Sequence, residues 1–297
     1  MDFSLIPPEE LIIMYPKMVE SFFFLLIAFM VKNRGGRSFK EQYYLNRTFF
    51  YAFLSWFVYI SLDIVIFLFA AISFDPNIAT PPGGVTGYPL AYPSLFITQI
   101  LRDVGMAGGI LNMLFLLVAA YQIRHGLEET KVNLTHNPFA LVLMIVFLVV
   151  ADYFDQIMVI ITPGQVALVT AQFSGMGLFA LAVEVAVYFV SAFMLRRAMF
   201  RDTSGADPSL LKRLRFISWG VLLMGIGDLY WVVEGALWNA PSNAPNFLLL
   251  QDVSFLLLII GHVIWTLSPI LVYLGLRRTG PEKEPQVAPA FHPLRST

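Results

Sequence analysis

Long apolar segments recur from one end of this 297-residue chain to the other, and no polar domain separates them. A membrane-spanning helix needs about 20 mainly apolar residues, and only helices or closed barrels satisfy their backbone groups inside lipid. The sequence lacks the ten-residue alternation of barrel strands, so it predicts helices. Hydrophobic residues make up 58% of the chain, against roughly 45–50% in soluble domains, an excess that a soluble core cannot hide. We therefore predict an all-α, polytopic membrane domain over residues 1–279.

Seven spans are predicted within this domain. They cover residues 12–32, 48–73, 94–123, 138–161, 166–195, 211–238 and 247–276. The first is the least regular, because Lys17 and Glu20 lie inside it. Residues 280–297 are rich in proline and poor in apolar side chains, so they are predicted to form a disordered tail.

The distribution of basic residues predicts the orientation of these spans. Of the 19 Lys and Arg residues, 17 lie in the segments after spans one, three, five and seven, and only Lys17 and Arg102 lie elsewhere. Cytoplasmic segments carry the excess of Lys and Arg in membrane proteins. We expect the N-terminus outside, the C-terminus in the cytoplasm and a multi-pass location in the plasma membrane. The formal net charge of −1 thus conceals a basic cytoplasmic side and an acidic remainder.

Composition also excludes several classes of function. A formal net charge of −1 argues against a nucleic-acid partner, because nucleic-acid binding needs a concentrated basic surface. With no cysteine, cysteine-ligated zinc and Fe–S clusters are excluded. No lysine lies between Lys212 and Lys283, so retinal cannot be bound covalently on spans six or seven. Only His262 lies within a span, which excludes a bis-histidine haem. No cofactor is predicted. Asp152 and Asp155 have the spacing of an aspartate pair that binds magnesium and pyrophosphate, but the predicted orientation puts them on the outer side, so the sequence assigns no metal.

Ionisable side chains inside the spans form a predicted layer near the midplane. Counting about 1.5 Å per residue from the cytoplasmic end of each helix puts five of them at about 18–22 Å. These five are Glu20, Asp152, Glu184, Asp228 and His262. Asp63 lies slightly further out and is included in the midplane polar layer. So many ionisable groups cannot all be charged in a low dielectric, so they must share protons, pair with a cation or line water. The alternative is that each carboxyl is protonated and forms a hydrogen bond with a neighbouring helix as a packing contact, with Lys17 and Glu20 paired on one helix.

A second set of polar side chains lies further outward, among aromatic residues. Trp231, Glu234 and Trp238 share one helical face, and an acid ringed by aromatics suits a cationic ligand. The alternative is an interfacial aromatic belt. The predicted ligand contacts are Arg102, Asp103, Asp152, Asp155, Asp228, Trp231, Glu234 and Asp252.

The cytoplasmic half of the spans is almost free of ionisable side chains. A conducting path would need polar positions on both sides of the midplane. The pattern therefore predicts a polar cavity open to the outside above an apolar plug. Glycines on spans three, five and six would permit close helix approach.

Three functions are compatible with these features. The first is a sensor or receptor that binds a cation or a small cationic or lipidic ligand and meets a cytoplasmic partner at residues 196–215. The alternative is a cation- or proton-coupled transporter. The third is a membrane-embedded enzyme that uses a buried carboxyl for acid catalysis on an isoprenoid or lipid.

Overall fold

The computed structural model describes residues 8–33, 40–73, 95–126, 130, 175–200, 208–238 and 245–277. Within these ranges the regular structure is entirely helical, which confirms the predicted all-α class. The helices are α1 (Pro8–Asn33), α2 (Lys40–Ser73), α3 (Leu95–His125), α6 (Gly175–Phe200), α7 (Pro208–Trp238) and α8 (Phe247–Leu276). The predicted span at 138–161 and the predicted tail at 280–297 lie outside the described residues.

Five of the described helices are long and apolar enough to cross a membrane. The candidate spans are Met14–Lys32, Tyr43–Val65, Ala107–His125, Leu211–Glu234 and Phe247–Leu276. Several such helices in one chain indicate a multi-pass membrane protein. The seventh helix and the sidedness stay predictions.

One helix extends well beyond its predicted span. α2 begins at Lys40 instead of residue 48. Arg47 extends this helix, because its guanidinium donates to the Tyr51 hydroxyl at 2.7 Å and lies over the Tyr43 and Tyr51 rings. Side-chain contacts between residues four apart stabilise a helix even where no lipid surrounds it.

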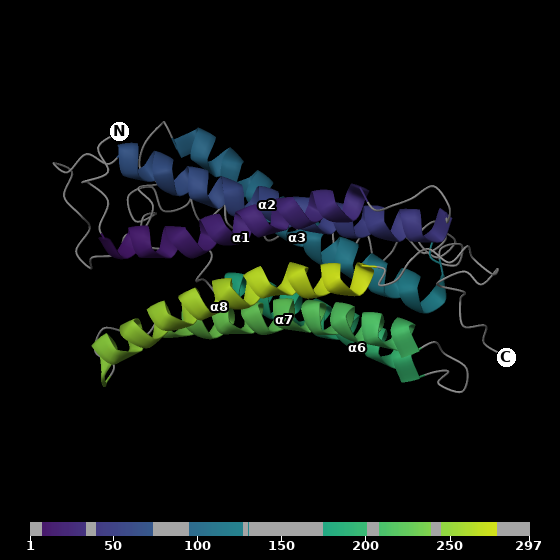
Figure 1. The fold of residues 1–297 in the computed structure, drawn as a ribbon. Coiled ribbons are helices and arrows are strands. Elements are labelled where there is room, and N and C mark those ends of the chain that lie inside the picture. The colour runs from purple at the N-terminus through teal and green to yellow at the C-terminus, as the bar shows by residue number, and fades with distance from the viewer. Residues whose placement is uncertain are drawn as a thin grey trace.

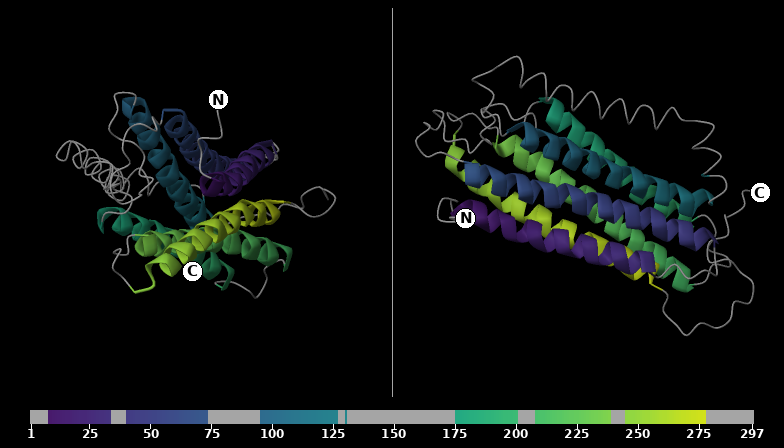
Figure 2. Two further views of the ribbon diagram at one scale, coloured as in Figure 1. Left: turned by 90° about the vertical axis from the view of Figure 1, so that its left-hand side faces the viewer. Right: turned by 90° about the horizontal axis from the view of Figure 1, so that it is seen from above.

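The six described helices form two layers (Figure 1). α1 and α2 lie over α7 and α8, and α3 runs obliquely from the first layer towards α6. Neighbouring pairs in contact are α1 with α2, α2 with α3, α3 with α6, α6 with α7, α7 with α8, and α8 with α1. The end view in Figure 2 shows the resulting ring. The C-terminal ends of α1, α3 and α8 lie at one end of the bundle (Figure 1), and basic residues stand in the last turn of α1 and α3 and directly after α8.

Glycines let α7 and α8 approach closely. A Cβ at Gly220 would stand 2.8 Å from the Ser268 carbonyl oxygen, and one at Gly275 would stand 2.6 Å from the Arg213 carbonyl oxygen. The Ser268 hydroxyl donates to the Gly220 carbonyl at 2.9 Å, and Arg213 Nε donates to the Gly275 carbonyl at 2.9 Å. Small residues at contacts are the usual means of close packing between membrane helices.

Candidate functional site

Every described helix contributes a side chain to one buried polar–aromatic cluster. Its members are Glu20 of α1, Trp56 of α2, Asn112 of α3, Tyr188 of α6, Asp228 and Trp231 of α7, and His262 and Trp265 of α8. Hydrogen bonds within the cluster join α8 to α1 and α6 to α3, so its contacts help to hold the two layers together.

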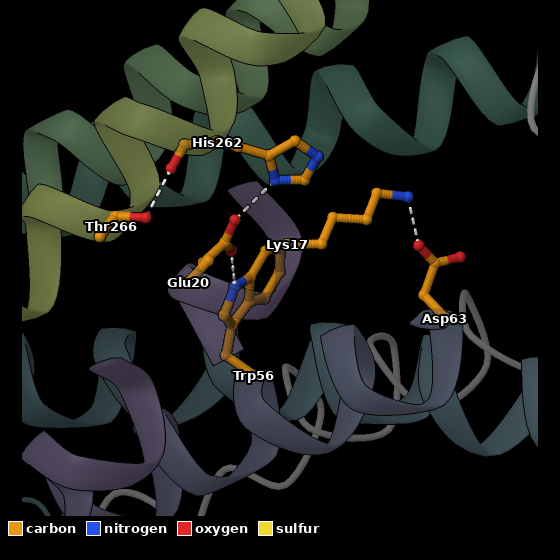
Figure 3. Close-up of polar contacts among 6 residues, drawn as sticks. All are labelled: Lys17, Glu20, Trp56, Asp63, His262 and Thr266. Atoms are coloured by element: carbon orange, nitrogen blue, oxygen red, sulfur yellow. Dashed lines mark hydrogen bonds and ion pairs between the residues drawn. The ribbon is translucent and has the colours of Figure 1, made fainter. Parts of the chain in front are cut away.

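Glu20 is the polar centre of this cluster (Figure 3). Its side chain is fully buried, and its Oε2 lies 2.6 Å from Nδ1 of His262, which is 3% exposed. The Trp56 indole N–H donates to the other carboxylate oxygen, Oε1. One carboxylate thus joins α1 to α2 and to α8.

Lys17 has a partner on a neighbouring helix that the packing alternative derived from the sequence did not include. Its ammonium forms an ion pair with Asp63 of α2 (Figure 3). The spacing of three residues on α1 places Lys17 and Glu20 on one face, yet the long lysine side chain reaches across to the next helix. Asp63 is therefore neutralised away from the rest of the polar layer.

Three tryptophans from different helices stack in the cluster. The Trp56 and Trp265 ring centroids are 3.7 Å apart with planes 7° from parallel, and Trp231 lies 5.5 Å from Trp265 at 6°. Tyr188 meets the Trp265 ring edge-on at 5.6 Å. Stacked and edge-to-face pairs of this kind stabilise by about 0.5–1.5 kcal/mol beyond their buried area. The stack couples α2 to α7 and α8.

Two glycines hold these rings by reciprocal packing. A Cβ at Gly227 of α7 would stand 2.3 Å from Cδ1 of Trp265, and a Cβ at Gly261 of α8 would stand 2.5 Å from Nε1 of Trp231. Each tryptophan follows the glycine of its own helix by four residues, in Gly-Asp-Leu-Tyr-Trp at 227–231 and Gly-His-Val-Ile-Trp at 261–265. The antiparallel helices therefore each place an indole against the other's glycine.

A second polar link crosses the layers through α3 and α6. The Tyr188 hydroxyl donates to Oδ1 of Asn112 at 2.6 Å, and Nδ2 of Asn112 donates to the Ala52 carbonyl oxygen at 2.8 Å. Both side chains are buried, so each satisfies a polar group that water cannot reach.

Four neighbouring members of the cluster keep polar atoms without a partner. Among the described residues no hydrogen bond reaches either carboxylate oxygen of Asp228, Nε1 of Trp231, Nε1 of Trp265 or Nε2 of His262. Asp228 is 1% exposed, and its carboxyl interacts electrostatically with Glu184, Glu20 and the Trp265 N–H. A buried unsatisfied polar group costs about 1–3 kcal/mol, so this concentration makes the cluster the candidate functional site.

The structure brings together some of the predicted site residues and separates others. Glu20, Asp228, Trp231 and His262 lie in the cluster, and Glu184 lies within electrostatic range of Asp228. Glu234 accepts a hydrogen bond from the Ser254 hydroxyl at 3.2 Å, and Asp252 is exposed. The predicted contacts Asp152 and Asp155, and the side chains of Arg102 and Asp103, lie outside the described part of the chain.

The sequence interpretation missed Trp56, Trp265, Tyr188 and Asn112. Trp56 and Trp265 read as ordinary core residues when each span is taken alone. The signal that could have found Trp265 is the repeated spacing of glycine, polar residue and tryptophan in the last two spans. In the described ranges no group of three or more His, Asp or Glu side chains could hold a metal ion.

Comparisons with protein-family models, with curated proteins and with solved structures found no match. Function is therefore inferred from the chemistry of the polar–aromatic cluster and from its place between the layers.

Proposed function

We propose that this chain is a membrane-embedded sensor of the receptor type. A small cationic or lipidic ligand at the acidic, outer end of the bundle changes how the layer of α1 and α2 packs on α7 and α8. The observation that carries this proposal is the buried bond between Glu20 and His262, which joins the two layers beside a stack of tryptophans. A link made of ionisable groups responds to charge, whereas an apolar contact does not.

The energetics of a buried polar link suit a switch. Burying a charged pair costs desolvation that offsets much of its attraction, so such a pair adds little net stability. Breaking it by removing one partner is nevertheless strongly unfavourable. Two arrangements of the layers, one in which Glu20 keeps its present partners and one in which it has others, can therefore lie close in free energy. A ligand shifts such an equilibrium by its difference in affinity for the two states.

The outer end of the cluster supports a cationic ligand. Lys17 neutralises Asp63, while Glu234 has a hydroxyl partner and Asp252 is exposed. Glu234 follows Trp231 by three residues on α7, and the Trp231 ring can interact with a cation. At the other end, Arg197, Lys212 and Arg215 are exposed, which supports an acidic cytoplasmic partner at residues 196–215.

Thermal unfolding of the purified protein in detergent tests the proposal. The probes are Na⁺, K⁺, Ca²⁺, primary and quaternary amines, and anionic lipid. A ligand at 100 times its Kd stabilises the folded state by about 2.7 kcal/mol. We expect at least one probe to raise the Tm of the wild type, with the shift reduced in Glu234→Gln and Asp228→Asn. Glu41→Gln, in a predicted cytoplasmic segment, is the matched control and should keep the shift.

Two results would contradict the sensor. One is a Tm that no probe changes. The other is a shift that is the same in Asp228→Asn, Glu234→Gln and the control.

A proton-coupled transporter is the second candidate. The observation in its favour is the same carboxylate–histidine pair, which lies between two layers of helices as in transporters that bind at the interface of two halves. Uptake into proteoliposomes separates the two functions. Uptake that follows a pH gradient and is lost in His262→Gln would establish the transporter in place of the sensor.

A further inference from the structure

We propose that one face of α1 and α2, at the basic end of the bundle, binds the negatively charged headgroup of an anionic phospholipid. We call it the basic–aromatic face, and its residues are Phe29 and Lys32 of α1 and Tyr43, Arg47, Phe50 and Tyr51 of α2. The proposal goes beyond the sensor, because it concerns another site and a ligand of the opposite charge.

The basic–aromatic face lies at one boundary of two candidate membrane spans. α1 ends and α2 begins at the same end of the bundle (Figure 1). Lys32 is the last residue of the span Met14–Lys32, and Tyr43 is the first residue of the span Tyr43–Val65. Side chains at the end of a span meet the headgroup layer, where tyrosine and basic residues are common. Lys32 and Arg47 therefore lie at the level of the lipid phosphates.

The two cations of the face have no acidic partner among the described side chains. Lys32 and Arg47 are both exposed. The described carboxylates that form ion pairs, Glu20 and Asp63, pair with other residues. Basic side chains beside the membrane attract anionic lipids, and these lipids are concentrated in the cytoplasmic leaflet, which is the predicted side of this end. The charge of the face thus complements that of the headgroup.

Arg47 is held in a geometry that suits a phosphate. Its guanidinium lies over the rings of Tyr43 and Tyr51, with Cζ 5.6 Å from each centroid. One terminal nitrogen donates to the Tyr51 hydroxyl at 2.7 Å, and the other donates to the Tyr43 hydroxyl at 3.4 Å. A guanidinium has more N–H groups than these bonds use, and each hydroxyl that accepts keeps its own hydrogen to donate. The three side chains therefore offer an ordered set of donors to phosphate oxygens.

Lys32 extends the face along α1. Its ammonium lies 5.0 Å from the centroid of the Phe50 ring and 6.0 Å from that of the Phe29 ring. The Phe50 ring in turn lies 5.3 Å from the Tyr51 ring, which Arg47 covers. Consecutive ring contacts thus join the two cations into one surface.

The exposed rings beside the cations favour a lipid over an acidic protein segment. Phe29, Tyr43 and Tyr51 are exposed. Phe29 precedes Lys32 by three residues, which places it about 4.5 Å closer to the middle of its span. A phospholipid has acyl chains below its phosphate, so it contacts the cations and the rings together. An acidic peptide matches the charges alone.

Native mass spectrometry of the full chain with added lipid tests the proposal. The probes are phosphatidylglycerol, which is anionic, and phosphatidylcholine, which has a phosphate but no net charge. We expect the wild type to bind phosphatidylglycerol more tightly. Arg47→Gln and Lys32→Gln should each lower that affinity about fivefold, the effect of one basic residue at an anionic surface. Lys212→Gln removes an exposed cation of α7, in the other layer, and is the matched control that should keep the affinity.

Variants that keep the charge test the geometry. Arg47→Lys keeps the cation but loses the paired bonds to the hydroxyls, and Tyr51→Phe keeps the ring but loses its hydroxyl. Each should weaken phosphatidylglycerol binding by less than Arg47→Gln does. Far-UV circular dichroism on the same samples measures the helix content. Tyr51→Phe keeps the proposal testable if the arginine variants lose helix.

Three results would overturn the lipid-binding role. One is an equal affinity of the wild type for the two lipids. The second is an affinity for phosphatidylglycerol that falls as much in Lys212→Gln as in Arg47→Gln. The third is displacement of the lipid by inorganic phosphate or by a glutamate-rich peptide at equal concentration, because the occupant would then be a free anion or an acidic protein.

The lipid-binding face and the sensor can fail separately. Arg47 is not a member of the polar–aromatic cluster, so Arg47→Gln should keep the Tm shift that a cationic probe produces in the wild type. Such a shift without a preference for phosphatidylglycerol would remove only the lipid-binding face. A screen in which no cationic probe changes the Tm, with the lipid preference present, would remove only the sensor.

Discussion

The polar–aromatic cluster and the apolar half of the bundle both hold the helices together, but they do so by different kinds of contact. The apolar half comprises the buried side chains on the basic side of the cluster, among them Val31, Phe49, Leu116, Leu195, Ile217 and Val272. A hydrogen bond in this half stays within one layer, where the Ser218 hydroxyl donates to the Ala192 carbonyl at 3.2 Å. In the cluster, by contrast, the bonds of Glu20 and Tyr188 cross between layers.

Because of this difference, we expect the apolar half to set the stability of the bundle and the cluster to set its response to a ligand. The apolar half holds the helices by packing that no ligand, proton or salt can alter. The cluster holds the layers by groups whose charge can change, and it leaves several of them unpaired. Substitutions in the two regions should therefore have different signatures, which the following experiments measure.

Removing Glu20 should have the largest effect. Glu20→Ala leaves the His262 imidazole and the Trp56 N–H buried without their acceptor. Loss of one partner from a buried pair costs about 3–5 kcal/mol. Reversible unfolding in mixed detergent micelles should show a loss of about 3 kcal/mol. Glu20→Gln keeps an acceptor for Trp56 and should lose less; equal losses in the two variants would contradict the assigned role of the carboxylate.

Substitution of a glycine that contacts a tryptophan ring should have the second largest effect. A Cβ at Gly227 would overlap the Trp265 ring, so Gly227→Ala must displace that ring. Overpacking of this kind costs about 1–3 kcal/mol. Near-UV circular dichroism should change with it, because the stacked indoles move. Gly109→Ala is the matched control, since its nearest neighbour lies at 3.8 Å and ordinary contact results. An unaltered spectrum in the Gly227 variant would show that the Trp265 ring does not pack against Gly227 as described.

A substitution in the apolar half should affect stability alone. Ile217 is fully buried, and removal of one methyl group in Ile217→Val should cost about 1 kcal/mol. The Tm shift produced by a bound probe should be the same as in the wild type. If this shift changed, the two regions would be coupled, and the separation between them would fail.

The outer ion pair should matter least. The side chains of Lys17 and Asp63 are 19% and 25% exposed, so solvent screens their attraction. Lys17→Gln should lower the free energy of unfolding by about 0.5 kcal/mol, and added salt should remove the difference. A loss as large as that of Glu20→Ala, insensitive to salt, would place Lys17 in the cluster after all.

Most of the described fold could be predicted from the sequence. Helix ends followed the apolar runs, so α7 and α8 end at Trp238 and Leu276 as expected. α2 departs from its span because Arg47 and its tyrosines extend the helix by contacts that hydropathy does not register.

The sequence could predict the level of the site residues along the helices, but not the side of each helix on which they lie. Counting from the charged ends brings Glu20, Asp228 and His262 to one level, because each helix has a constant rise. The count does not give the side of the helix that faces a neighbour, so it could not choose between Glu20 and Asp63 as the partner of Lys17. Trp56 was missed for the same reason, since its role depends on rings from other helices.

The distance between the two layers tests the central claim most directly. The chain has no cysteine, so spin labels can be placed without background at Lys32→Cys on α1 and Lys212→Cys on α7, both exposed. Double electron–electron resonance should give a distance distribution that changes when a probe that raises the Tm is added. Asp228→Asn should abolish that change. A distribution that the probe leaves unchanged in the wild type, as in Asp228→Asn, would show that the cluster is a static packing element and not a switch.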